Sequence, residues 1–221
     1  MEKRSPKVAI VDYALGNLFS IKHACEWVGL DSIITSDKEE ILDADGVLLP
    51  GMGAFGDAMN TLRKLDLVAV LRDVGASDRP LIGICLGIQL LLSESYEFGR
   101  HKGLGIIEGE VIPLDHPREG DKQLKVPQIG WNQIASARSW DETFLQSVPD
   151  KEYMYFVHSF VPQPQDASVV LAKTTYGGVE FCSSLQRENV FACLFHPERS
   201  SKMGLRIYEN LALHLRHSLK G

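Results

Sequence analysis

The first 95 residues alternate short, uninterrupted apolar runs with segments of helical spacing, and this alternation limits the fold more than any other feature. The apolar runs, which predict buried strands, are residues 7–13, 31–35, 46–51 and 80–85. The segments of helical spacing are residues 16–29, 56–75 and 86–95. Continuously apolar strands that alternate with helices form right-handed βαβ units around a parallel sheet. We therefore predict an α/β fold in which an open, mostly parallel sheet carries helices on both faces.

Strand-like segments joined by turns replace this pattern beyond residue 99. They are residues 103–114, 126–134, 153–160, 168–178, 179–186 and 189–198. We expect them to add antiparallel strands to the sheet, with a mobile loop at 115–123. From Ser201 onward, apolar residues at every fourth position predict a final helix; they are Met203, Ile207, Leu211 and Leu215. A length of 221 residues fits one core, so we expect a single domain over residues 1–221.

Composition limits where the protein can work and which kinds of ligand it can bind. The formal net charge of -6 argues against nucleic acid or a membrane surface as the main partner, because both attract basic patches. The N-terminal apolar run is too short for a signal peptide or a spanning helix, so we expect a cytoplasmic protein. The 4 cysteines form no C-x-x-C pair, which argues against a zinc site and predicts free thiols in a reducing compartment. We expect no metal and no cofactor.

Cys85 lies at the bend between a predicted buried strand and the helix that follows it. The segment from Gly83 to Gly87 reads G-I-C-L-G, which is the spacing of a nucleophile elbow. A nucleophile on so sharp a turn needs neighbours without side chains, and the turn directs the backbone N–H of Leu86 toward the group under attack. The dipole of the helix favours the thiolate form. A cysteine that only fills the core is the alternative, because buried cysteines are common.

A nucleophilic thiol needs a base, and His196, at the end of an apolar strand, is the best placed of the 7 histidines. Glu198 follows two residues later, and Pro197 between them stiffens the backbone, so the carboxylate can reach the imidazole. These residues predict a Cys–His–Glu triad in which Glu198 sets the tautomer and stabilises the imidazolium. Zinc deaminases share the H-x-E spacing, but no P-C-x-x-C follows here, which disfavours a metal. A polar strand end is the simpler interpretation of H-P-E by itself.

Residues 50–56 read P-G-M-G-A-F-G and match the dinucleotide-binding pattern G-x-G-x-x-G. That pattern also requires an acidic residue at the end of the next strand, where this chain has Cys85. We interpret the glycines as a mobile loop whose backbone N–H groups can form an oxyanion hole. A simple tight turn is the alternative.

Six ordered segments resemble the triad-type, class I glutamine amidotransferases over nearly the whole chain. They read DYALGNLFSIKHACEWVG, PGMGAFGDAM, GICLGIQLL, VPQIGWN, YFVHSF and FHPERS. The first, fourth and fifth of these are similar to the glutaminase subunits of imidazole glycerol phosphate synthases, which act in histidine biosynthesis. The resemblance implies a flavodoxin-like amidotransferase fold.

The resemblance also implies a mechanism and a substrate site. Cys85 would attack the side-chain amide of L-glutamine; His196, supported by Glu198, would protonate the departing ammonia and then activate water. The oxyanion donors would be the backbone N–H groups of Met52, Gly53 and Leu86. Glutamine would be held by Gly51, Gln89, Glu97, His158, Ser159 and Phe160, with Glu97 on its α-amino group.

A partner is implied as well, because the ammonia would pass to the β/α barrel of a cyclase subunit in a heterodimer. The face toward this partner would include Asn17, Trp131, Asn132, Tyr155 and Arg199. Three positions depart from the family pattern. Gln128 and Arg199 stand where the family has His and Lys, and we expect both near the partner face; Phe160 stands where it has Tyr.

Three other functions use parts of the same pattern. A paralogous amidotransferase would feed ammonia to a related synthase, for example in surface-sugar amination. A free-standing cysteine hydrolase would use the same elbow and histidine, but it leaves Gln89, Glu97 and the VPQIGWN segment without a role. A nucleotide-binding module would use the glycine-rich loop, but it leaves the triad without a role. We therefore expect a glutaminase subunit.

Overall fold

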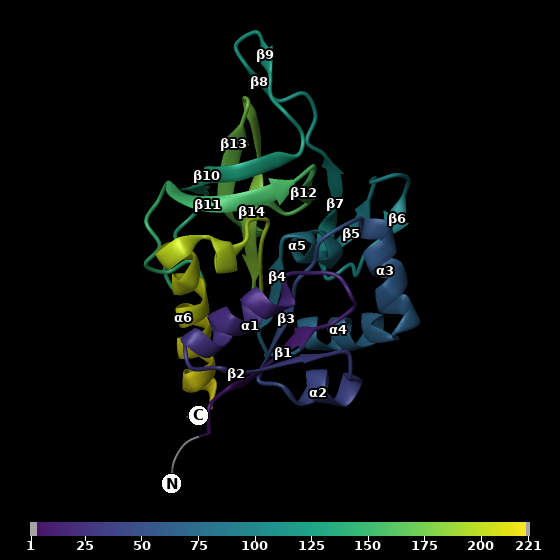
Figure 1. Ribbon diagram of the computed structural model, residues 1–221, viewed down its shortest axis with the longest axis vertical. Helices are drawn as coiled ribbons and strands as arrows, with labels where there is room; N and C mark the ends of the chain where they lie inside the picture. The colour runs from purple at the N-terminus through teal and green to yellow at the C-terminus, as the bar shows by residue number, and fades with distance from the viewer. Residues whose placement is uncertain (1–3, 220–221) are drawn as a thin grey trace.

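A nine-stranded sheet runs through the structure, a computed structural model that describes residues 4–219 (Figure 1). Its strands lie in the order β11-β10-β13-β14-β15-β4-β3-β1-β2. The parallel part comprises β1 (Lys7–Val11), β2 (Asp31–Thr35), β3 (Gly46–Leu49), β4 (Leu81–Ile84) and β15 (Val190–Cys193). The antiparallel part comprises β10 (Gln128–Ser136), β11 (Glu152–His158), β13 (Val170–Tyr176) and β14 (Val179–Arg187). The predicted fold class is confirmed.

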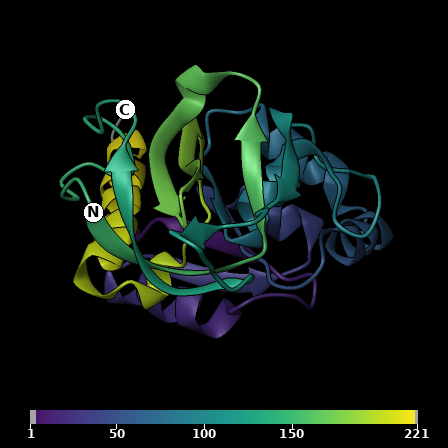
Figure 2. The same ribbon diagram turned by 90° about the horizontal axis from the view of Figure 1, so that it is seen from above.

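The central parallel strands are buried because helices cover both faces of this part of the sheet. All residues of β3, β4 and β15 are buried, so continuous apolar runs suit both sides of each strand. Helices α1 (Leu18–Trp27) and α6 (Ser201–Ser218) pack together over one face (Figure 1). The opposite face carries α2 (Lys38–Asp43), α3 (Phe55–Lys64) and α4 (Leu67–Gly75), as the view from above also shows (Figure 2).

The final helix confirms the predicted apolar stripe. Ile207, Leu211 and Leu215 are buried against the core, whereas Met203 is only partly buried because it lies in the first turn. Among residues 4–219, no helix combines the length and the apolar character that a membrane crossing requires.

A second, four-stranded sheet differs from the expectation that all later strands extend the first one. It contains β12 (Phe160–Pro164), β7 (Ile107–Pro113), β5 (Leu92–Ser95) and β6 (His101–Lys102). The helix expected over residues 86–95 therefore ends early, as α5 (Leu86–Leu91). Backbone N–H groups of residues 104–106 donate to the carbonyls of residues 90–92 and take the place of further helical bonds. The segment expected as a mobile loop forms a short hairpin of β8 (Arg118–Glu119) and β9 (Lys122–Gln123).

The carboxyl ends of four neighbouring parallel strands meet at one edge of the sheet, which is where sites form in open α/β folds. Strand β4 lies between β3 and β15, with Gly83 paired to Leu49 and Ile84 paired to Cys193. The segments that follow β1, β3, β4 and β15 therefore come together, and each contributes to the site described below.

Close packing at the turn after β4 explains its glycines. A Cβ on Gly87 would overlap the backbone carbonyl of Leu49 in the neighbouring strand. A Cβ on Gly83 would lie 3.0 Å from the backbone of Gly87 and 3.1 Å from Ala192. The absence of side chains lets the first turn of α5 rest directly on the sheet, which sets the position of Cys85.

Gly87→Ala should destabilise the fold, because the new methyl group has no space beside the Leu49 carbonyl. We expect a loss of about 3 kcal/mol in the free energy of unfolding, at the upper end for overpacking, measured by urea denaturation. Gly120→Ala is the control: its φ of 60° also disfavours alanine but nothing lies within 4 Å, so it should lose about 1 kcal/mol. Equal losses in the two variants would show that crowding at the elbow is not limiting.

Candidate active site

Cys85 occupies a strained backbone conformation at the end of β4. Its φ of 55° and ψ of -111° are unfavourable for a residue with a side chain. Its backbone N–H donates to the Cys193 carbonyl at 2.9 Å, which ties the turn to β15. The residue is 6% exposed, and Sγ lies 3.6 Å from the Val157 carbonyl. The sulfur thus faces a pocket at the start of α5.

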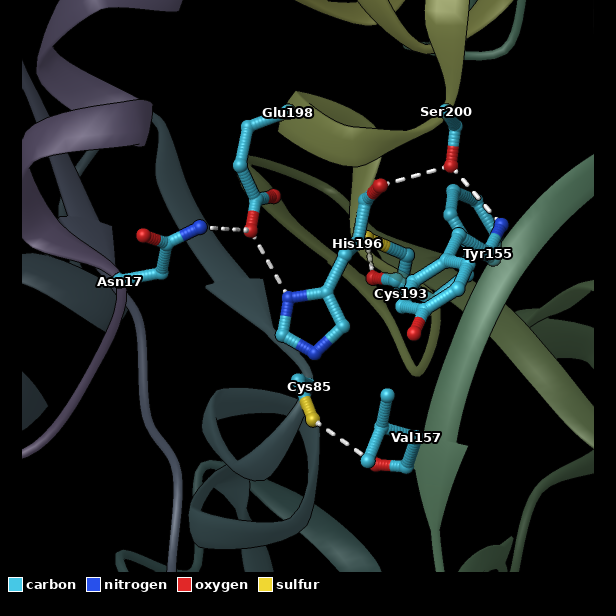
Figure 3. A network of polar contacts seen from close by, with 9 residues as sticks. Asn17, Cys85, Tyr155, Val157, Cys193, His196, Glu198 and Ser200 are labelled. Carbon is cyan, nitrogen blue, oxygen red and sulfur yellow. Dashed lines mark hydrogen bonds and ion pairs between the residues drawn. The ribbon is translucent and has the colours of Figure 1, made fainter. Parts of the chain in front are cut away.

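His196 and Glu198 lie beside this sulfur, at the end of β15. Nδ1 of His196 is 2.8 Å from Oε1 of Glu198, because the short helical turn Pro197–Arg199 brings the carboxylate back onto the ring. The opposite edge of the imidazole faces the thiol of Cys85 (Figure 3). A proton on Nδ1 satisfies the carboxylate and leaves Nε2 for the sulfur. Carboxylate, imidazole and thiol are therefore in line, the arrangement of a nucleophile with its base.

Three hydrogen bonds fix the backbone of His196 against β11. Its N–H donates to the Tyr155 carbonyl at 2.9 Å. Its carbonyl accepts from Oγ of Ser200 at 2.6 Å, and the same Oγ accepts from the Tyr155 N–H at 3.0 Å (Figure 3). Ser200 is 1% exposed and was not singled out from the sequence, although it directly follows the H-P-E-R segment. The ring therefore has little freedom to leave the sulfur.

A pocket of about 320 Å³ opens beside the sulfur. It is lined by Met52, Gly53, Cys85, Leu86, Gln89, Glu97, Pro127, Val157, His158, Ser159, Phe160, His196 and Arg199. Most residues predicted for the site are thus brought together, and Pro127 and Val157 join them from segments already singled out. Gly51 and Glu198 lie just outside the lining: Gly51 packs against Leu86, and Glu198 lies behind His196.

Gln89 reaches across the pocket to the segment at the end of β11. Its Nε2 donates to the Phe160 carbonyl at 3.3 Å, and Nδ1 of His158 lies 3.1 Å from the same oxygen. Burial lowers the pKa of His158 to about 4, so near neutral pH the ring is uncharged and Nδ1 acts as a donor. His158 therefore orients backbone rather than supplying charge.

Glu97 joins the pocket to the glycine-rich loop. One of its oxygens, Oε2, accepts from the backbone N–H of Phe55 at 2.5 Å, at the first turn of α3. This contact fixes the far end of the loop, and Oε1 remains for a ligand in the pocket. Within the loop, Met52 is 46% exposed and Gly53 has a φ of 99° that favours glycine.

The sequence matches the family model described as "Glutamine amidotransferase class-I" over residues 9–215. The chain belongs to the class-I glutamine amidotransferase family. It is 43% identical to a Geobacter sulfurreducens protein over 92% of this chain and 97% of that protein. It is 44% identical to an Aquifex aeolicus protein over 92% of this chain and 95% of that one. Both relatives carry the name "Imidazole glycerol phosphate synthase subunit HisH".

Solved structures place this amidotransferase in the same fold. "Structure of PurLQS from Thermotoga maritima" superposes with a TM-score of 0.74 at 18% identity, covering 96% of this chain and 100% of that one. "Crystal structure of glutamine amidotransferase" gives a TM-score of 0.70 at 19% identity, covering 92% of this chain and 98% of that one. These likenesses agree with the parallel sheet and flanking helices described above.

Electrostatics at the triad of the amidotransferase favour a charged imidazole. Burial of His196 opposes its charge, but hydrogen bonding with Cys85 and Glu198 outweighs this and raises its pKa to about 10. The Glu198 side chain is fully buried, and its Oε1 also accepts from Nδ2 of Asn17 at 3.3 Å. Its other oxygen, Oε2, has no hydrogen-bond partner among the described residues. A buried carboxylate held in this way is stabilised by a positive charge on its neighbour.

An aromatic and cationic cluster borders the pocket on the expected partner side. The rings of Trp131 and Tyr155 meet edge to face at 6.0 Å, and the Arg199 guanidinium lies 4.8 Å from the Tyr155 ring centroid. Trp131 is 50% exposed, and Ile129, two residues earlier on the same strand face, is 64% exposed. Ile129 and Trp131 thus place exposed apolar surface on the outer face of β10.

Two residues expected near that side lie on the opposite face of β10 from Trp131. Asn132 follows Trp131 in β10 and therefore points to the opposite face, where it donates to the Thr175 carbonyl at 3.0 Å. Gln128 is 2% exposed and pairs with His158 across the strands, so its departure from the family pattern affects the interior. Strand alternation decided both positions. Asn17 contacts Glu198, as described above, and thus lies against the triad.

The raised pKa of His196 predicts a pH-dependent stability. Because the imidazolium is favoured in the folded chain, its contribution is complete below pH 6.5 and is lost as the pH rises to about 10. The difference in unfolding free energy between the wild type and Glu198→Gln should therefore shrink over this range. Urea denaturation at several pH values measures it. A difference that stays constant would show that the ring is uncharged in the folded protein.

Proposed function

We propose that the chain is the glutaminase subunit of imidazole glycerol phosphate synthase and acts in histidine biosynthesis. It would hydrolyse L-glutamine to glutamate and ammonia, and the ammonia would pass to a cyclase subunit. The observation that carries this proposal is the line of Glu198, His196 and Cys85 at one wall of a pocket shared with Gln89 and Glu97. The two relatives named HisH support the particular synthase.

The first chemical step forms a thioester. The sulfur of Cys85 attacks the side-chain carbonyl carbon of glutamine, and the carbonyl oxygen takes up the negative charge. Backbone N–H groups of Leu86, Met52 and Gly53 would bind this oxyanion, because all three residues line the pocket beside the sulfur. The imidazolium of His196 then gives its proton to the departing nitrogen, and the carbon–nitrogen bond breaks to release ammonia.

The second step returns the enzyme to its starting state. His196, now neutral, takes a proton from water, and the oxygen of that water attacks the thioester carbon. The carbon–sulfur bond breaks, glutamate leaves, and the imidazolium and thiolate are restored. Glu198 keeps Nδ1 protonated throughout through the contact at 2.8 Å, so only Nε2 exchanges protons with the reacting groups.

The pocket suits the polar groups of free glutamine. The Oε1 oxygen of Glu97 would bind the α-ammonium group, since Oε2 already accepts from Phe55. The backbone of His158, Ser159 and Phe160 would line the rest of the site, held in place by Gln89 and by the neutral ring of His158. A carboxylate paired with an ammonium group in a half-buried pocket provides selectivity for an amino acid over a simple amide.

The partner would be the cyclase subunit, which makes imidazole glycerol phosphate and AICAR, in a heterodimer located in the cytoplasm. The cluster of Trp131, Tyr155 and Arg199 supports this docking side, because aromatic and Arg side chains are common anchors of protein interfaces. Arg199 also lines the pocket, so ammonia formed at Cys85 would leave beside the docked partner. This placement would keep ammonia from bulk water.

Cys85→Ala should abolish glutamine hydrolysis, because no other group of the triad can form the thioester. The variant should still bind the cyclase and support synthesis from externally supplied ammonia, measured as imidazole glycerol phosphate formed in the complex. Cys25→Ala, which removes a fully buried thiol outside the pocket, is the matched control and should retain glutaminase activity. Substantial glutamine-dependent turnover by Cys85→Ala would contradict the mechanism.

The different positions of His196 and Glu198 in the triad predict that substituting them lowers glutaminase turnover by different amounts. His196→Asn removes the proton carrier, whereas Glu198→Gln keeps it and weakens only its orientation and charge stabilisation. Glu198→Gln should therefore retain at least about tenfold more glutaminase turnover than His196→Asn. Both should match the wild type in the ammonia-dependent assay. If the glutamate variant is the more damaged, the two roles are assigned wrongly.

A further inference from the structure

The phenol of Tyr13 lies outside the triad but contacts the start of the glycine-rich loop, next to the elbow. Tyr13 follows β1, is 1% exposed, and donates its hydroxyl proton to the Pro50 carbonyl at 2.5 Å. Pro50 begins the glycine-rich loop after β3. A Cβ on Gly51 would collide with the Tyr13 hydroxyl and would lie 2.8 Å from Cβ of Leu86. The hydroxyl thus sits where the loop meets the elbow.

This hydrogen bond holds a peptide plane. The Pro50 carbonyl and the Gly51 N–H belong to one planar trans unit, so they point in opposite directions and turn together. Turning the plane would break the bond between the Pro50 carbonyl and the Tyr13 hydroxyl. Both groups would then lack a hydrogen-bond partner in a buried site, which costs free energy. The next two residues of the loop are more open, since Met52 is 46% exposed and Gly53 is exposed as well. The restraint therefore ends at Gly51, directly before the proposed oxyanion donors.

The hydroxyl keeps its proton in this environment. Burial, and then the charge of the nearby Cys85, raise the pKa of Tyr13 well above its usual value. A neutral phenol can donate a hydrogen bond to the loop, and its ring fills space beside the loop and the elbow. Tyr13 itself does not line the pocket, so it does not contact glutamine.

We propose that Tyr13 is a positioning residue for the oxyanion loop: its hydroxyl holds the Pro50–Gly51 peptide plane against the elbow, so that the N–H groups of Met52 and Gly53 face the tetrahedral intermediate. This inference rests on the proposed glutaminase function. Because the phenol acts through the loop and contacts no substrate, its hydroxyl stabilises the transition state more than the bound glutamine. Its loss therefore lowers kcat and leaves KM unchanged.

The test compares Tyr13→Phe with Tyr176→Phe in the full chain. Tyr176 offers a matched control, because its hydroxyl also donates to a backbone carbonyl, that of Lys125 at 3.0 Å, and it does not line the pocket. Glutaminase kinetics are measured with the cyclase subunit present. Tyr13→Phe should lose about tenfold in kcat, less than the cost of removing an oxyanion donor outright, at constant KM. Tyr176→Phe should match the wild type.

Amide hydrogen exchange of the peptide containing residues 50–55 supplies a readout that does not depend on activity. Tyr13→Phe should speed exchange there, and Tyr176→Phe should not. A Tyr13→Phe variant with wild-type kcat, or with a change in KM alone, overturns the inference. If the wild-type complex itself releases no glutamate from glutamine, the proposed function fails. The exchange measurement then still tests this inference: unchanged exchange in Tyr13→Phe overturns it, and faster exchange supports it.

Discussion

The backbone conformation of Cys85 is the constraint on which the rest of the site depends. A residue with a side chain combines a φ of 55° with a ψ of -111° only where its surroundings over-determine it. Here the surroundings are the bond from its N–H to the Cys193 carbonyl and the contact of Gly87 with the Leu49 carbonyl. Both contacts require β4 to lie between β3 and β15. The strand order of the sheet is therefore a precondition for a sulfur that faces the pocket.

The edge strand of the antiparallel part lies against the triad, although the triad residues follow strands of the parallel part. Strand β11 stands at the far edge of the sheet, separated from β15 by β10, β13 and β14. It nevertheless contacts the turn after β15, through Tyr155, and approaches the sulfur of Cys85, through the Val157 carbonyl. The sheet must curl to allow this. The antiparallel part thus closes the pocket over the proposed nucleophile, Cys85, and the proposed base, His196, both of which follow strands of the parallel part.

Single side chains border both the apolar cluster around Trp131 and the triad. Arg199 lines the pocket and also lies over the ring of Tyr155, a contact worth about 0.5–1 kcal/mol at an exposed site. Asn17 donates to the buried carboxylate of Glu198, which in turn holds His196. A displacement of Asn17 would therefore remove a hydrogen bond from the carboxylate that holds the His196 ring. Both contacts are possible because the triad lies at the carboxyl edge of the parallel strands.

The sequence by itself determined the parallel part of the fold, the bend at Cys85 and the candidate base. Each of these depends on local order: apolar runs of strand length, two glycines around one cysteine, and a glutamate two residues after a histidine. The tertiary structure alone decided the early end of α5, the second sheet and the contacts of Tyr13 and Ser200. Those features rest on hydrogen bonds and packing between distant segments, such as Tyr13 with Pro50 or Ser200 with Tyr155. Local spacing carries no information about such partners, because the chain must first fold before they become neighbours.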